Sequence, residues 1–161
     1  MKFLKTILVA LPILLQATSY SQDLMSVRIR KIAGKKRSVY FKKGIFHSGT
    51  NKTASVLKAI RHGYQPANGY ERLVFDFKTT TPPKVYGYKS DGEKKIFIDF
   101  FNTSLASDHG VFGTTKYIDK IDFYPVGDES LSVEVALKGK NSIDVFYLEK
   151  PGRLVIDIKK Q

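Results

Sequence analysis

Apolar and polar residues alternate in short runs along most of the chain, and one run returns three times. The copies share a basic first residue, alternating apolar positions and an aspartate in fifth place; they occupy residues 72–77 (RLVFDF), 95–100 (KIFIDF) and 153–158 (RLVIDI). Alternation with a period of two is typical of a β-strand that buries one face. The pattern therefore predicts repeated use of one strand design.

From residue 54 onward the pattern predicts a duplicated unit of four strands. The predicted strands are 56–60, 73–77, 85–88 and 96–100 in the first unit, and 117–121, 133–137, 144–147 and 154–158 in the second. Turn-forming pairs such as Asn68-Gly69, Asp91-Gly92 and Pro151-Gly152 separate the runs. We therefore expect an all-β fold, a β-sandwich of two related sheets, because a duplicated four-strand unit supplies two sheets.

Residues 1–21 have the pattern of a secretory signal peptide. Basic residues precede an apolar run from Ile7 to Leu15, and Ser19 and Ser21 are small residues that suit a cleavage site. The run is much shorter than the roughly 20 residues that span a bilayer as a helix. We expect cleavage, no transmembrane span afterwards, and a location in the periplasm or cell envelope.

The charge of the chain narrows the choice of partner. The chain has 27 Lys and Arg residues against 15 Asp and Glu residues, a formal net charge of +12. An exported protein with this excess is attracted to polyanions. The expected partner is peptidoglycan or another anionic envelope polymer, and not nucleic acid, which an exported protein seldom meets.

Much of the positive charge lies in residues 22–53, which are predicted to be a basic extension that suits a hairpin. Its residues proposed for electrostatic contact are Arg28, Arg30, Lys35, Lys36, Arg37, Lys42 and Lys43. These residues could hold an anionic polymer, lipopolysaccharide or an acidic lipid surface. They could also protect a solvated strand edge against unwanted pairing, and the sequence leaves both explanations open.

Residues 54–161 resemble the AMIN domain. The motifs that carry the resemblance are Ala59-Ile60-Arg61, the strand 72–77 with its Arg and Asp, and Pro151-Gly152-Arg153 followed by Leu-Val-Ile-Asp at 154–157. The strand 131–137 departs from the pattern, since Ser132 and Ala136 stand where the repeat would place Arg and Asp.

The resemblance implies a β-sandwich in a bacterial envelope whose outer faces carry the Arg and Asp motifs and contact peptidoglycan. AMIN domains are usually targeting modules attached to cell-wall amidases or to the secretins of type IV pili. We therefore expect an exported, non-catalytic cell-envelope module that binds peptidoglycan for targeting or scaffolding. The alternative is a protein-interaction module of a secretion or type IV pilus apparatus, in which an envelope protein extends an exposed sheet edge.

Alternation within the repeated strands also predicts which side chains face outward. The residues predicted to bind peptidoglycan are Arg72, Asp76, Lys95, Asp99, Arg153 and Asp157. Aspartate accepts hydrogen bonds from hydroxyl and amide groups, and arginine can fork onto a stem-peptide carboxylate. Cross-strand Arg–Asp pairing that only fixes the strand register is the alternative. The strands also carry tyrosines that could lie against sugar rings or simply span from the core to water. They are Tyr64, Tyr70, Tyr86, Tyr88, Tyr117, Tyr124 and Tyr147.

Catalytic chemistry finds little support in the sequence. The three histidines, His47, His62 and His109, lack the close spacing of a metal site, and the chain has no cysteine. It also has no glycine-rich phosphate loop. We expect no catalytic residue, no metal and no cofactor.

Overall fold

The computed structural model describes residues 44–48, 53–108, 113–127 and 129–161. The predicted signal peptide and the basic residues from Arg28 to Lys43 lie outside the described residues. The chain divides into two units, residues 1–36 and 37–161, and every described residue belongs to the second. Among the described residues, no helix combines the length and the hydropathy needed to cross a bilayer.

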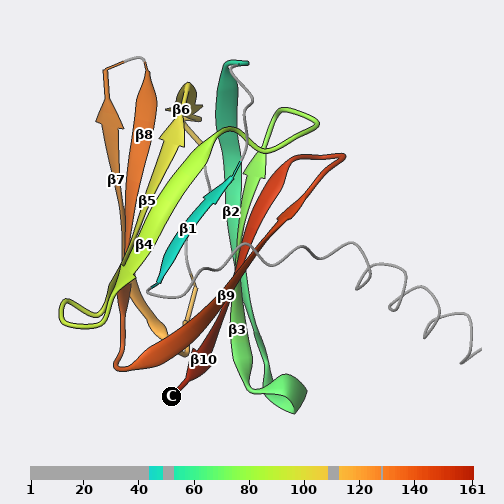
Figure 1. The fold of residues 1–161 in the computed structure, drawn as a ribbon. Coiled ribbons are helices and arrows are strands. Elements are labelled where there is room, and N and C mark those ends of the chain that lie inside the picture. Colours follow the sequence, from blue (N-terminus) through green and yellow to red (C-terminus); the bar gives the residue numbers. More distant parts are fainter. Residues whose placement is uncertain (1–43, 49–52, 109–112, 128) are drawn as a thin grey trace, which may run out of the picture. The chain divides into compact units, whose positions relative to one another are not determined.

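The second unit is a β-sandwich of two five-stranded sheets, as predicted (Figure 1). Sheet A has the order β6 (Thr103–Leu105), β2 (Ser55–Gln65), β3 (Tyr70–Phe77), β10 (Arg153–Lys160) and β9 (Asn141–Leu148). Sheet B has the order β1 (Ile45–Ser48), β4 (Val85–Ser90), β5 (Lys95–Phe101), β8 (Ser130–Leu137) and β7 (Ile118–Val126). A short 3-10 helix, η2 (Pro66–Asn68), joins β2 to β3. Neighbouring strands are antiparallel except for the parallel pair β2 and β6.

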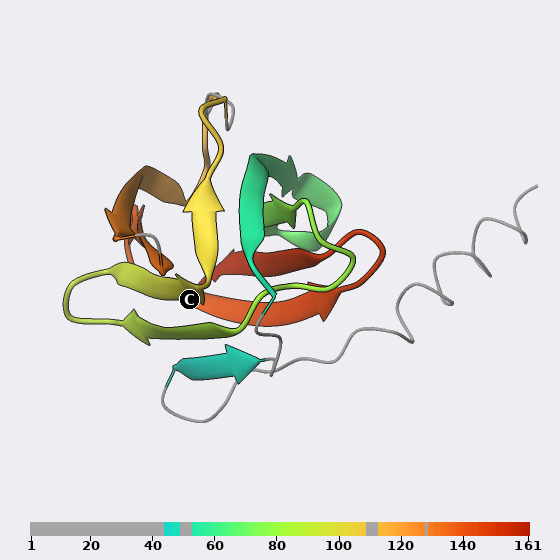
Figure 2. The same ribbon diagram turned by 90° about the horizontal axis from the view of Figure 1, so that it is seen from above.

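The two predicted units are interleaved between the sheets. The first unit gives the hairpin β2–β3 to sheet A and β4–β5 to sheet B, and the second gives β7–β8 to sheet B and β9–β10 to sheet A. Both sheets are visible from above in Figure 2. A bulge interrupts β2 between Leu57 and Ala59, and another interrupts β7 between Ile118 and Lys120, at equivalent positions of the two units. The shared bulge supports the duplication.

The core lies between the sheets and follows directly from strand alternation. In β3, buried and half-buried residues alternate along the whole strand. The ring of Phe100 in β5 lies 5.3 Å from that of Phe75 and 5.1 Å from that of Phe77, both in β3. This aromatic cluster ties the two sheets together, because tilted ring pairs at this separation add to the stabilisation from burial.

The sandwich begins before the predicted boundary at residue 54. Strand β1 pairs with β4 and buries Phe46 completely. A Cβ atom at Gly87 would lie 2.3 Å from Cζ of Phe46, so the missing side chain of Gly87 makes room for this ring. β1, inside the range predicted to be the basic extension, is thus an edge strand of sheet B.

We expect Gly152→Ala to destabilise the protein by about 2 kcal/mol, the cost of crowding a packed position. A Cβ atom at Gly152 would lie 2.5 Å from the carbonyl carbon of Thr81 and 2.7 Å from the nitrogen of Pro82. These are backbone atoms, so the clash cannot be relieved by a side-chain rotation. Gly92→Ala is the matched control, since nothing lies within 4 Å of its Cβ position. Urea unfolding measures both, and equal midpoints would contradict the expectation.

Candidate functional site

The six residues predicted to bind peptidoglycan fall on two opposite faces of the sandwich. Arg72, Asp76, Arg153 and Asp157 lie on the outer face of sheet A, and Lys95 and Asp99 lie on β5 in sheet B. The register places Arg72 opposite Asp157 and Asp76 opposite Arg153 on the adjacent strands β3 and β10. The six residues therefore belong to two surfaces, and only the four on sheet A are brought together.

Arg72 and Asp157 are bonded to each other. Nε and one terminal nitrogen of Arg72 donate to the two carboxylate oxygens of Asp157 at 2.6 and 2.8 Å. The guanidinium also lies 5.1 Å from the ring centre of Tyr70 and 5.2 Å from that of Phe146. The hydrogen bonds to Asp157 raise the pKa of Arg72 above its ordinary value. This forked pair is directed across the sheet and joins β3 to β10.

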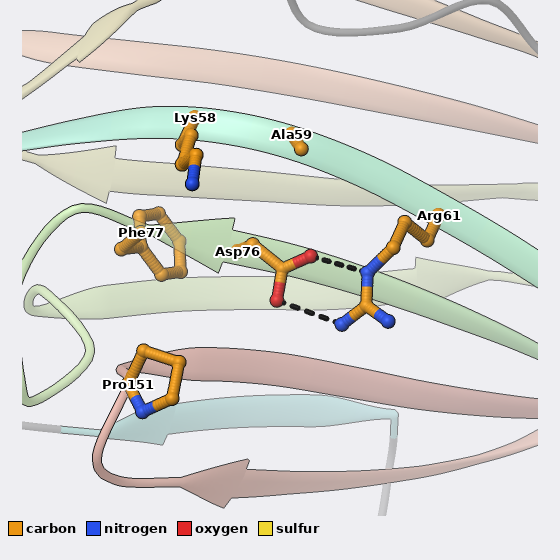
Figure 3. A pocket seen from close by; sticks show the side chains of 6 residues that line it. All are labelled: Lys58, Ala59, Arg61, Asp76, Phe77 and Pro151. Carbon is orange, nitrogen blue, oxygen red and sulfur yellow. Dashed lines mark hydrogen bonds and ion pairs between the residues drawn. The ribbon is translucent and has the colours of Figure 1, made fainter.

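Arg61 and Asp76 form a second forked pair, at a more exposed place (Figure 3). The two nitrogens of Arg61 in β2 donate to Asp76 in β3 at 2.5 and 2.8 Å. The hydrogen bond to Asp76 raises the pKa of Arg61 above its ordinary value. The side chain of Arg61 is 59% exposed, whereas that of Asp76 is 16% exposed. Arg61 thus offers most of its surface to solvent while it holds a largely covered carboxylate.

A hollow of about 330 Å³ adjoins this pair. Its lining residues are Lys58, Ala59, Arg61, Asp76, Phe77 and Pro151 (Figure 3). The bulge in β2 leaves Lys58 without a register partner on β3, and Lys58 is exposed. The hollow therefore combines an apolar floor with charged groups, the mixture that positions a polar ligand.

Arg153 is a further cationic residue on the strand next to Asp76, and it is not among the residues that line the hollow. It lies opposite Asp76 in the register of β10 and β3. Its Nε is buried and has no hydrogen-bond partner within the described part of the chain. Lys58 and Arg61 thus line the hollow together with a single carboxylate, Asp76. The surplus of positive charge suits an incoming carboxylate, which arginine binds through charge-assisted hydrogen bonds.

The predicted residues on sheet B also have partners. Nζ of Lys95 donates to Glu134 at 2.7 Å, and the hydroxyl of Ser132 donates to Asp99 at 2.6 Å. Ser132 occupies the place that Arg72 has in the first unit, and Asp99 the place of Asp157. The departure from the repeat at Ser132 thus replaces a forked ion pair by a neutral hydroxyl that bonds the equivalent aspartate.

A buried carboxylate fixes the segment before β7. Glu71, fully buried in β3, accepts hydrogen bonds from the backbone N–H groups of Lys116, Tyr117 and Ile118, the shortest of them 2.6 Å from Tyr117. Nδ1 of His62 lies 3.4 Å from the same carboxylate, and its Nε2 accepts from the N–H of Gly113 at 3.2 Å. Both ring nitrogens of His62 therefore face groups of the protein itself.

Two of the lining cations were not among the residues predicted from the sequence. Arg61 carries a signal, since it belongs to the Ile-Arg dipeptide of the AMIN resemblance. Lys58 carries none, because its position depends on a bulge. Within the described ranges, no three His, Cys, Asp or Glu side chains come together as a metal site would require. No protein-family model matches the chain, and neither the curated proteins nor the solved structures contain a match to it.

Proposed function

We propose that this protein is an exported, non-catalytic cell-envelope module that binds peptidoglycan for targeting or scaffolding. The resemblance to the AMIN domain suggests this function, and the hollow beside Arg61 is the observation that carries it. Two cationic residues, Lys58 and Arg61, line it with one carboxylate, Asp76, on a chain with a net charge of +12. Peptide stems of peptidoglycan end in carboxylates, which match this surplus of donors.

In this proposal the two forked ion pairs on sheet A have different roles. Arg72 and Asp157 are covered by rings and satisfied by each other, so they hold the strands in register. Arg61 is exposed, and so is Lys58, which lines the same hollow. A stem carboxylate entering the hollow would bond Arg61 and Lys58 while Asp76 receives a donor such as a stem amide.

We expect the double variant Lys58→Ala/Arg61→Ala to bind purified peptidoglycan sacculi at least about tenfold more weakly, because each charge-assisted hydrogen bond is worth on the order of 1.5–3 kcal/mol. The measurement is co-sedimentation at low and at physiological salt. Removing the stem peptides from the sacculi should weaken binding of the unaltered protein by a similar factor.

The matched control for this experiment is Lys120→Ala/Lys140→Ala. It removes the same charge at exposed positions away from the hollow. If both double variants sediment equally, the binding depends on net charge alone and the assignment of the hollow is wrong. If sacculi bind none of the proteins, the peptidoglycan proposal itself fails.

The outer edge of β9 favours a second function, interaction with an envelope protein. β9 is an edge strand of eight residues, and it contains neither Lys nor Pro, the residues that commonly protect such edges. A partner strand could extend sheet A there by main-chain hydrogen bonds. Ser142→Lys with Asp144→Lys should abolish capture of one envelope protein from a lysate freed of cell wall; unchanged capture would exclude this edge.

A further inference from the structure

The outer face of sheet B is rich in exposed aromatic rings. Tyr86 and Tyr88 in β4 are 39% and 38% exposed, and Tyr124 in β7 is 47% exposed. Tyr88 stacks on Phe97 of β5, with the ring centres 4.8 Å apart and the planes at 20°. The stacked pair holds Tyr88 in place, so its ring is prepared for a contact before any ligand arrives.

Polar groups lie between these rings in one transverse row. The register places Tyr86 opposite Asp99, Asp99 opposite Ser132, and Ser132 opposite Tyr124. Since neighbouring strands are roughly 4.8 Å apart, the two tyrosines at the ends of the row are separated by about 14 Å. The carboxylate of Asp99 accepts from Ser132 and has lone pairs left for further donors. Across the sheet, the row therefore consists of an aromatic ring, a carboxylate, a hydroxyl and a second aromatic ring.

The charges on this face are balanced, unlike those of the whole chain. Lys95 is paired with Glu134 at 2.7 Å, and Lys120 is paired with Asp122 at 3.0 Å. Lys84 lies over the ring of Phe101, with its nitrogen 4.8 Å from the ring centre. Paired cations attract a polyanion only weakly, and the carboxylates repel it. A lipid surface or an apolar protein surface would in turn bury the Asp99 carboxylate and the phenol hydroxyls without offering them further hydrogen-bond donors or acceptors.

We propose that the outer face of sheet B binds the neutral sugar chain of a polysaccharide. The C–H faces of pyranose rings are apolar and lie against the rings of Tyr86, Tyr88 and Tyr124. The sugar hydroxyls donate to Asp99 and to the phenol oxygens between these contacts. A flat, charge-balanced sheet face with alternating rings and acceptors matches a chain whose units alternate apolar faces with hydroxyl edges. The proposal goes beyond stem-peptide binding, because it concerns the opposite sheet and a ligand without peptide.

The test uses the full chain and a hexamer of β-1,4-linked N-acetylglucosamine, a neutral probe without stem peptides. The chain has nine tyrosines and no tryptophan, so a change in tyrosine fluorescence reports binding, and calorimetry gives the affinity. We expect Tyr86→Ala to weaken binding roughly tenfold through loss of one ring contact, whereas Tyr86→Phe retains the ring and most of the affinity.

Tyr64→Ala is the matched control, since Tyr64 lies on β2 in sheet A and is also 39% exposed. Equal affinities of the Tyr64 and Tyr86 alanine variants would overturn the proposal, as would absence of hexamer binding at millimolar concentration. A different result would identify a protein interface and also overturn the proposal. In that case the parent chain would capture an envelope protein but not bind the hexamer, and the Tyr86→Ala variant would no longer capture that protein.

The outcome separates this proposal from the function proposed for the hollow. Lys58→Ala/Arg61→Ala should leave hexamer binding unchanged and reduce binding to intact sacculi. Tyr86→Ala should reduce hexamer binding and retain the dependence on stem peptides. Either surface can therefore fail its test while the other passes.

Discussion

Phe100→Ala should lower the free energy of unfolding by about 4 kcal/mol, as truncation of a buried phenylalanine does when the cavity stays open. Phe100 is fully buried in β5 and contacts the rings of Phe75 and Phe77 from the facing sheet. Both neighbours are themselves fixed in the central strand β3, so the site cannot collapse readily. Chemical unfolding followed by circular dichroism measures the loss.

Phe97→Ala is the control for that variant. Phe97 is on the same strand but on its outer face, where it stacks on Tyr88. Its removal should cost only about 1 kcal/mol, the range of an aromatic pair. If the two variants lost equal stability, the inter-sheet aromatic cluster would not be the main contact between the sheets.

Glu71→Ala should destabilise the protein by about 3 kcal/mol or more, because it orphans several buried donors at once. The carboxylate accepts from three consecutive backbone N–H groups at residues 116–118. Glu71→Gln keeps one acceptor oxygen and should recover part of the loss. Besides unfolding experiments, hydrogen exchange should show faster exchange of the amides of Tyr117 and Ile118 in the alanine variant.

The comparison for Glu71 is Glu134→Ala. Glu134 is half-buried on the outer face of sheet B and is paired with Lys95. An exposed ion pair of this kind contributes at most about 1 kcal/mol. A Glu71→Ala variant as stable as Glu134→Ala would show that the segment before β7 is held by other contacts.

Strand alternation was sufficient to predict the sandwich and most of its core. The positions of Leu73, Phe75 and Phe77 follow from a period of two, and the same period separates them from Arg72 and Asp76. The interleaving of hairpins between the sheets did not follow, because a repeat of four strands says nothing about which hairpins pair. β1 was missed because the alternating pattern over residues 45–48 is too short to distinguish a strand from a loop.

The candidate site was predictable in part. Outward positions followed from alternation, and cross-strand Arg–Asp pairing was one of the two alternatives. Which residues pair, such as Arg72 with Asp157, did not follow from the sequence. The hollow depends on the bulge at Lys58 and on the turn at Pro151. The spacing of residues along the sequence does not reveal that β2 and the β9–β10 turn line the same hollow. The Glu71 cluster was hidden for a related reason, since a charged residue at an inward position breaks the alternating pattern and is recognised only when its donors are in view.

The placement of β10 has a consequence for the order of folding. β10 lies between β3 and β9, and its forked pair joins residues 85 positions apart in the chain. Contacts of such long sequence separation form slowly, on the millisecond-to-second scale typical of β-sandwiches. Sheet A cannot close until residues 153–160 have left the ribosome, so until then one edge of β3 lacks its partner strand.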